Sequence, residues 1–228
     1  MIAASLMCAD YLRLGEQITE LEAAGVDSLH FDVMDGIFVP NLGVGPQVYQ
    51  AVRRRTALPC DVHLMVSRPA AVIPLYEGAE WITIHAEPEP HNLRWLLDDI
   101  RCRGSKPGVA LNPATDPSVL RWVVDQIEMV LVMTVNPGFA GQAIIPAMAA
   151  KVEALHELLA EHGRDDVIIS VDGNINAATI PALSAAGATM FVGGSSGLFL
   201  PDRSLARAVE ELRAAGKASL EASAPAAA

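Results

Sequence analysis

Eight short apolar runs, separated by segments long enough to form helices, constrain the fold of this 228-residue chain. The runs lie near residues 2–8, 28–34, 60–66, 81–86, 107–111, 129–135, 167–172 and 190–194. Near-continuous hydrophobic strands are expected where both faces of a parallel sheet are covered. Eight of them predict an α/β fold, a single-domain (β/α)8 TIM barrel over residues 1–214. A doubly wound open sheet is the alternative, but no GxGxxG follows the first run.

Helical periodicity supports this alternation. Apolar residues recur at helical spacing before Gly25, before Gly104 and before Gly163, and a glycine is the residue that a helix end prefers. The segment 215–228 is rich in small residues and shows no core pattern. We predict that it is a frayed helix end followed by a disordered tail.

Charge and cysteine content exclude several classes of function. The net charge of −11 argues against a nucleic-acid or anionic-membrane surface, and the only basic run is Arg53–Arg55. The three cysteines have no paired spacing, which favours free thiols. No apolar run reaches the roughly 18 to 20 residues that span a bilayer, so we expect a cytoplasmic protein.

Four residues stand at the ends of these apolar runs and are candidates for a metal site. Alternate residues of a strand point to the same side, so His30 and Asp32 can both face the barrel mouth. His63 follows on the next strand and Asp172 on the seventh. Two imidazoles and two carboxylates suit Zn²⁺, Mn²⁺, Fe²⁺ or Co²⁺. The alternative for the first pair is a buried, hydrogen-bonded couple without a metal.

Four further titratable residues lie near the same strand ends. Asp35 lies in an Asp-Gly turn, so we expect its side chain to cap the loop. Asp61, two residues before His63, can support a ligating histidine from behind. His85 and His91 are interpreted as structural.

Glycine-rich segments follow the sixth, seventh and eighth runs, and they predict a phosphorylated substrate. They are residues 136–142 (NPGFAGQ), 172–174 (DGN) and 193–197 (GGSSG). Backbone N–H groups in such loops approach an anion closely, and barrels often hold phosphate after strands seven and eight. Simple tight turns are the alternative. Met34, Met65 and Met133 lie beside these positions and can exclude water from a reactive intermediate, although core packing is the usual role of methionine.

Taken together, the segments SLMCAD, HFDVMDGIFVPNLGVGP, DVHLMV, ITIHAE, VALNPAT, VLVMTVNPGFAGQ, SVDGNI and VGGSSGLF resemble the ribulose-phosphate 3-epimerase family, in order, over about residues 2–200. The resemblance implies a metal-dependent epimerase that inverts C3 of a phosphorylated ketose through an enediolate. It implies one divalent metal ion (Zn, Mn, Fe, Co or Mg) held by His30, Asp32, His63 and Asp172. Asp32 and Asp172 would also be the acid/base pair.

The same resemblance implies substrate contacts. Ser5 and His63 would touch the sugar, and the phosphate would lie against Gly138, Phe139, Ala140, Gly141, Gly173, Asn174, Gly194 and Ser195. The three methionines would cap the intermediate. Family members commonly assemble, so we expect a homo-oligomer.

Three departures from the family pattern bear on the substrate. Asn174 and Ala140 stand where the family usually has glycine, and SSGLF replaces a GSA-type ending. The segments SLMC, HLMVSRP, TVNPGFAGQ and SGLF resemble the D-allulose-6-phosphate 3-epimerase branch and favour D-allulose 6-phosphate to D-fructose 6-phosphate. The alternative is D-ribulose 5-phosphate to D-xylulose 5-phosphate. A phosphosugar lyase or aldolase and a non-catalytic sugar-phosphate binding protein are more distant alternatives.

Overall fold

Eight parallel strands follow one another around a closed barrel, and β1 pairs with β8 to complete the ring. The computed structural model describes residues 1–223, with side chains up to residue 217. The strands are β1 (Ile2–Ser5), β2 (Ser28–Met34), β3 (Cys60–Met65), β4 (Trp81–His85), β5 (Lys106–Leu111), β6 (Met129–Met133), β7 (Ile168–Asp172) and β8 (Met190–Gly193). The predicted (β/α)8 barrel is confirmed, and every predicted strand is present.

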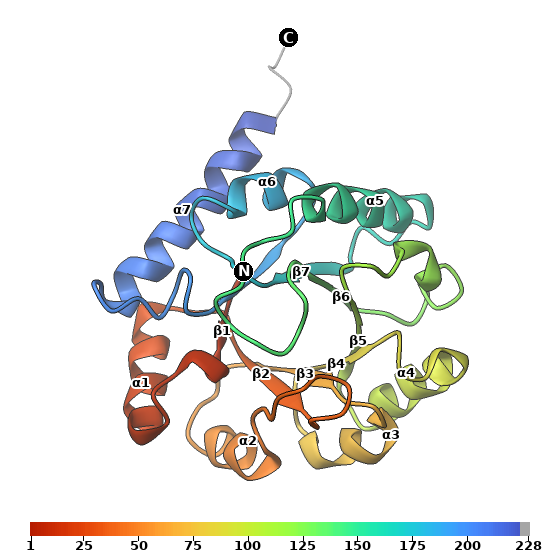
Figure 1. The fold of residues 1–228 in the computed structure, drawn as a ribbon, viewed down its shortest axis with the longest axis horizontal. Helices are drawn as coiled ribbons and strands as arrows, with labels where there is room; N and C mark the ends of the chain where they lie inside the picture. Colours follow the sequence, from red (N-terminus) through yellow and green to blue (C-terminus); the bar gives the residue numbers. More distant parts are fainter. Residues whose placement is uncertain (224–228) are drawn as a thin grey trace.

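The helices form an outer ring around the strands (Figure 1). They are α1 (Leu14–Ala24), α2 (Pro46–Arg53), α3 (Pro69–Val72), α4 (Leu93–Cys102), α5 (Met148–Glu161), α6 (Ile180–Ala185) and α7 (Leu205–Ser223). The three helices expected from periodicity are α1, α4 and α5. Gly25, directly after α1, has φ 77°, the left-handed conformation that ends a helix.

Two segments differ from a simple alternation of strands and helices. Between β5 and β6 the described chain forms only turns and a short 3₁₀ helix, Pro117–Leu120. At the other end, α7 continues past position 214, so the predicted domain boundary falls inside a helix. The last part of the predicted disordered tail, 224–228, lies outside the described residues.

Side-chain alternation along the strands separates two packing environments. On β2, Leu29, Phe31 and Val33 face outward and join the large core between the sheet and the helices. The residues between them face the barrel interior, because successive strand side chains point to opposite sides. Burial of each of these three side chains stabilises the fold by about 1.5–3 kcal/mol. The apolar face of β2 therefore packs against the helices, and the face with His30 and Asp32 turns toward the barrel interior.

The barrel interior is divided between apolar and polar side chains. The apolar interior cluster consists of Ala3, Trp81, Ala110, Met129, Leu131, Met133, Met190 and Val192. Buried polar side chains point inward from β2, β3 and β7, including Ser28, Asp61 and Ser170. Burying a polar group costs free energy unless the group has a hydrogen-bond partner. The polar side chains of β2, β3 and β7 therefore mark the part of the interior where a functional site is expected.

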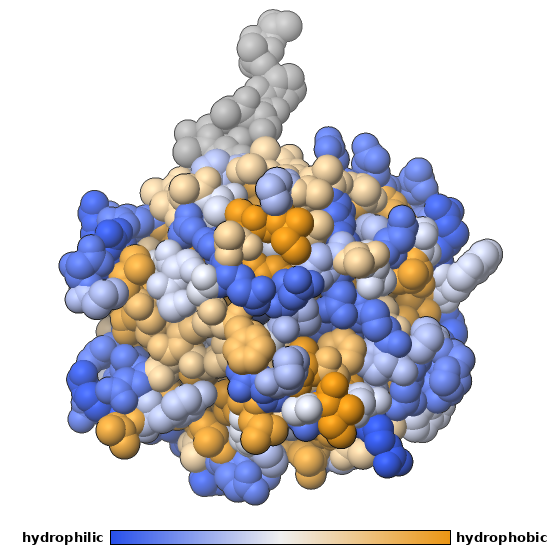
Figure 2. Space-filling view, in the orientation of Figure 1, coloured by the Kyte–Doolittle hydropathy of each residue, from blue (hydrophilic) through white to orange (hydrophobic). Residues whose placement is uncertain are grey.

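The face viewed in Figure 1 carries the C-terminal ends of the strands, and the loop between β6 and α5 arches over the barrel centre. In the space-filling view of this face, apolar residues form several separate groups among polar ones (Figure 2). None of the helices described in residues 1–223 is long and apolar enough to cross a membrane.

Candidate active site

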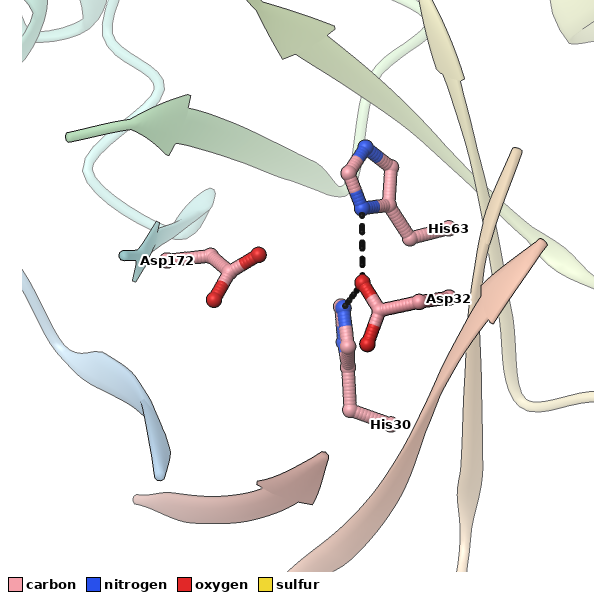
Figure 3. Close-up of side chains that lie close together, drawn as sticks. All are labelled: His30, Asp32, His63 and Asp172. Atoms are coloured by element: carbon pink, nitrogen blue, oxygen red, sulfur yellow. Dashed lines mark ion pairs between the residues drawn. The ribbon is translucent and has the colours of Figure 1, made fainter. Parts of the chain in front are cut away.

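Four side chains with metal-binding atoms converge inside the barrel from three strands, and only Asp172 stands at the end of its strand. His30 and Asp32 come from β2, His63 from β3 and Asp172 from the last position of β7. One donor atom from each lies within 4.8 Å of the others. Asp172 faces the other three across the barrel (Figure 3). The register explains part of this, because Asp32 pairs with His63 and both therefore turn inward.

Two ring nitrogens of this cluster have no hydrogen-bond partner. His30 Nε2 lies 3.4 Å and His63 Nδ1 3.6 Å from Oδ1 of Asp32, and both nitrogens are buried. An unsatisfied buried polar atom costs about 1–3 kcal/mol, and coordination of a cation would satisfy both. Two imidazoles and two carboxylates are also a suitable ligand set for a first-row divalent ion. The residues present therefore fit a divalent metal.

The other ring nitrogen of His30 is held by Asp61. The Nδ1 atom lies 2.6 Å from Oδ2 of Asp61, and both side chains are fully buried. A carboxylate accepts the Nδ1–H, so Nε2 is the ring atom that faces the cluster. The predicted contact of Asp61 with a histidine is therefore present, and the histidine is His30.

His63 is held differently, by a residue that the sequence analysis treated as structural. Its Nε2 lies 2.9 Å from Nε2 of His85 on β4, and His85 Nδ1 lies 3.0 Å from Oε2 of Glu87. The sequence contained a signal for this pair. His85-Ala-Glu87 places an imidazole and a carboxylate two residues apart at a strand end, as His30-Phe-Asp32 does.

The two carboxylates of the cluster have opposite electrostatic environments. Burial opposes ionisation of Asp32, but the adjacent His30, whose own pKa is raised by Asp32 and Asp61 despite its burial, outweighs this effect, so the pKa of Asp32 falls below its usual range. Ser5 Oγ also donates to Asp32 Oδ2 at 2.7 Å. Burial, reinforced by the charge of Asp32, raises the pKa of Asp172 to about 7. At neutral pH the site therefore holds one ionised carboxylate and one that readily gains or loses a proton.

A cavity of about 540 Å³, including its open mouth, lies directly above these carboxylates. Its lining includes Ser5, Asp32, Met34, Met65, Met133, Gly138, Phe139, Ala140, Gly141, Asp172, Gly173, Asn174, Gly194 and Ser195. The lining therefore brings together the predicted substrate contacts other than His63, which is buried beneath it, and all three predicted methionines.

Side-chain hydrogen bonds join the loops around this cavity. Asn41, on the loop after β2, donates from Nδ2 to the carbonyl oxygen of Gly138 at 2.7 Å, which joins the loops after β2 and β6. Asn174 donates from Nδ2 to the carbonyl oxygen of Gln142 at 2.6 Å, which joins the loops after β7 and β6. Asn174 has φ 52°, a left-handed conformation that asparagine tolerates better than most residues. Its replacement of the usual glycine is therefore accommodated by the backbone.

Asp35 and His91 lie outside the cluster. Asp35 accepts hydrogen bonds from the backbone N–H groups of Ile37, Phe38 and Ser67, so its predicted loop-capping role is confirmed. His91 lies in a short 3₁₀ helix before α4 and contacts only Asn92 among the polar side chains described.

The sequence is similar to curated proteins over nearly its whole length. A model described as the Ribulose-phosphate 3 epimerase family matches residues 1–199. A Bacillus subtilis ribulose-phosphate 3-epimerase is 42% identical over 214 residues, covering 93% of this chain and 97% of that protein. A Treponema pallidum protein of the same name is 46% identical over 197 residues, covering 86% and 89%.

Solved structures with low sequence identity share the fold. A 3-hexulose-6-phosphate synthase superposes with a TM-score of 0.65 at 19% identity, covering 94% of this chain and 98% of that one. A Thermus thermophilus phosphoribosyl anthranilate isomerase gives 0.64 at 18% identity, covering 96% and 98%. These likenesses concern the barrel alone. The family match and the curated relatives place the chain in the ribulose-phosphate 3-epimerase family, as an isomerase of the epimerase class.

Proposed function

We propose that the protein interconverts D-ribulose 5-phosphate and D-xylulose 5-phosphate by inverting C3. The observation that carries this proposal is the pair of carboxylates, Asp32 and Asp172, facing each other across one cavity. Relatives named ribulose-phosphate 3-epimerase at 42% and 46% identity support the five-carbon substrate. They favour it over D-allulose 6-phosphate, the substrate predicted from the segments that resemble that branch.

Inversion at C3 needs a proton removed from one face and returned to the other. The C3–H bond beside the C2 ketone breaks, its electron pair moves toward the ketone oxygen, and an enediolate forms. Asp32 and Asp172 are placed to act from opposite faces, one as base and one as acid, exchanging roles in the reverse direction. Positioned proton transfer contributes about 10²–10⁴-fold. Without metal, the pKa of Asp32 is shifted down and that of Asp172 up to about 7, so the two carboxylates have different electrostatic environments.

His30, Asp32, His63 and Asp172 would hold the divalent metal. Such an ion, when bound, supplies Lewis-acid stabilisation of the negative charge that develops on the enediolate, worth several kcal/mol. The histidines then serve as ligands only, and the two aspartates combine ligation with proton transfer.

The remaining lining residues would bind and orient the substrate. Gly138–Gly141, Gly173–Asn174 and Gly194–Ser195 line the cavity, and their backbone N–H groups would bind the phosphate. Ser5 lies at the reactive end, beside Asp32. Met34, Met65 and Met133 exclude water from the enediolate. Binding energy from the phosphate then orients C3 between the carboxylates.

A side-by-side assay tests the proposed substrate. Purified protein supplied with a divalent metal is given D-ribulose 5-phosphate and D-allulose 6-phosphate in separate reactions, and kcat/KM is measured for each. We expect the five-carbon substrate to give the higher value. A higher value for D-allulose 6-phosphate would reverse the substrate assignment, and release of an aldehyde would identify a lyase. The expected homo-oligomer stays a prediction, which sedimentation of the same sample checks.

A further inference from the structure

A buried chain of hydrogen bonds leads away from His63 on the side opposite the cavity. In Figure 3 one ring nitrogen of His63 faces Asp32 and the other points away. The second nitrogen, Nε2, meets His85 Nε2 at 2.9 Å, and His85 Nδ1 meets Glu87 Oε2 at 3.0 Å. Both histidines are almost completely buried. Water therefore has little access with which to replace any bond of this chain.

The far end of the chain is held by the backbone after β5. Glu87 Oε1 accepts hydrogen bonds from the backbone N–H of Asn112 at 2.8 Å and from the hydroxyl of Thr115. Lys151, a buried lysine of α5, donates from Nζ to the carbonyl oxygen of Asn112 at 2.5 Å. Its positive charge lies close enough to interact with Glu87. One oxygen of Glu87 is therefore committed to the Asn112 N–H, and the other is left for His85.

The positions of the hydrogens along the Glu87–His85–His63 hydrogen bonds determine the tautomer of His63. An ionised carboxylate only accepts, so His85 Nδ1 carries the hydrogen that faces Glu87. A neutral imidazole has one N–H, so His85 Nε2 is bare and must accept. The facing Nε2 of His63 must then donate, which leaves His63 Nδ1 bare. That Nδ1 is the unpartnered atom that faces Asp32.

We propose that Glu87, acting through His85, is a positioning residue that sets the tautomer of His63 and keeps its Nδ1 free to bind metal. This inference rests on the metal site included in the proposed function. His30 reaches the equivalent state through one direct bond to Asp61, whereas His63 reaches it through a second imidazole. Glu87 thus influences the metal site without being one of its ligands.

The substitution Glu87→Gln reverses the donor and acceptor roles along these hydrogen bonds, because glutamine has nearly the same shape as glutamate but carries an NH₂ group. The single oxygen of the amide must accept from the backbone N–H of Asn112, because that donor cannot rotate away. The NH₂ group then faces His85 Nδ1, which loses its hydrogen to Nε2. His85 now donates to His63 Nε2, and the hydrogen of His63 moves to Nδ1, where it blocks coordination.

Two measurements on metal-stripped protein test this, and neither requires a sugar phosphate. Long-range ¹H–¹⁵N spectra of the histidine rings report the tautomers directly: we expect His63 Nε2–H in the wild type and His63 Nδ1–H in Glu87→Gln. The dissociation constant for Zn²⁺, measured by competition with a chelator, should rise about 10–100-fold in Glu87→Gln, as typical for loss of a group behind a metal ligand. Glu89→Gln, on the same loop, is the matched control and should change neither readout.

The wild-type spectrum keeps the proposal testable even if Glu87→Gln does not fold. A wild-type protein with His63 protonated on Nδ1 would overturn the proposal. So would a folded Glu87→Gln protein that keeps His63 Nε2–H and binds Zn²⁺ within about twofold of the wild type. Neither readout uses a substrate, so both remain interpretable if the assigned sugar phosphate is wrong. If instead the proposed role of Glu87 is wrong, the epimerase assay can still succeed, so the two failures are distinguishable.

Discussion

The two sides of the cavity are built in different ways. On the side of β1 to β4, side chains hold one another: Ser5 bonds Asp32, Asp61 bonds His30, and His85 bonds His63. On the side of β6 to β8, no side chain among residues 1–217 hydrogen-bonds the carboxylate of Asp172, and the lining is mostly backbone from glycine-containing loops. One side fixes donor atoms, and the other leaves room for a ligand.

This difference bears on the chemistry. Fixed partners lower the pKa of Asp32 and hold two ring nitrogens toward one point, as metal binding needs. With burial and the charge of Asp32 acting on it, Asp172 has a pKa of about 7 and can change protonation state at neutral pH. Proton transfer across the cavity needs both properties, because an acid and a base of similar environment would both be ionised.

Removing the proton-transfer group from the less constrained side has the largest expected effect. In Asp172→Asn the amide neither takes nor returns a proton at C3, so kcat should fall by about 10²–10⁴-fold. Steady-state kinetics on D-ribulose 5-phosphate, with circular dichroism to check the fold, measure this. Asp165→Asn, an exposed residue before β7, is the control and should retain normal turnover. Turnover of Asp172→Asn within tenfold of wild type would remove Asp172 from its role.

Breaking one bond on the more constrained side comes next. Asp61→Ala leaves the buried Nδ1–H of His30 without an acceptor, so the free energy of unfolding should fall by about 1–3 kcal/mol. The affinity for a divalent metal should fall about 10–100-fold. Urea unfolding and chelator competition check both values. Asp125→Ala, which removes an exposed ion pair with Arg94, is the control, and equal effects in the two variants would contradict the account.

The raised pKa of Asp172 predicts a pH-dependent stability in metal-stripped protein. The folded pKa of about 7 lies above the ordinary 3.8, so folding favours the protonated carboxyl. Its stabilising contribution is complete below the unfolded pKa and is lost as the pH rises through about 7. Between about pH 5 and about pH 8, the Tm of the wild type should therefore fall relative to that of Asp172→Asn, whose amide does not titrate. A constant difference between the paired melting curves would show that Asp172 is not shifted.

The smallest expected effect concerns Asn174 on the loop side. Asn174→Gly loses the side-chain bonds to Gln142 and from Asn176 but accepts φ 52° freely. Only the Gln142 bond reaches the loop after β6, and at about 0.5–1.5 kcal/mol its loss should raise KM by no more than about tenfold. Asn174→Ala loses the same bonds and adds a left-handed strain of about 1–2 kcal/mol. Thermal melts should therefore rank the alanine variant below the glycine variant. The reverse order would mean that the backbone conformation at 174 does not limit stability.

Much of the fold could be predicted because strand and helix periods are local properties of the sequence. The run SLHFDVM already separates Leu29 and Phe31 from His30 and Asp32, and the barrel places those two sets on opposite faces. The same spacing allowed Asp61 to be identified behind a histidine. The inward-facing positions of the apolar runs were therefore sufficient to find the cluster, although His30, Asp32 and His63 lie within their strands and not at the ends.

Contacts between neighbouring strands were harder to predict. The His63–His85 bond depends on how far β4 is displaced along β3, and no local pattern fixes that displacement. Lys151, on α5, bonds the carbonyl oxygen of Asn112, whose N–H holds Glu87. Hydrophobic periodicity describes neighbouring residues only and cannot predict a contact between residues so far apart in the sequence. The missing α-helix between β5 and β6 was also not foreseen, because Leu120 and Val124 keep an apolar pattern that turns can bury equally well.

The central claim is that two carboxylates invert C3 by moving a proton on opposite faces of the substrate. Incubation with D-ribulose 5-phosphate in D₂O, followed by ¹H NMR of the D-xylulose 5-phosphate formed, tests it directly. The account predicts product carrying solvent deuterium at C3, because the returned proton comes from a group that exchanges with water. Epimerised product that keeps its original C3 hydrogen would contradict it.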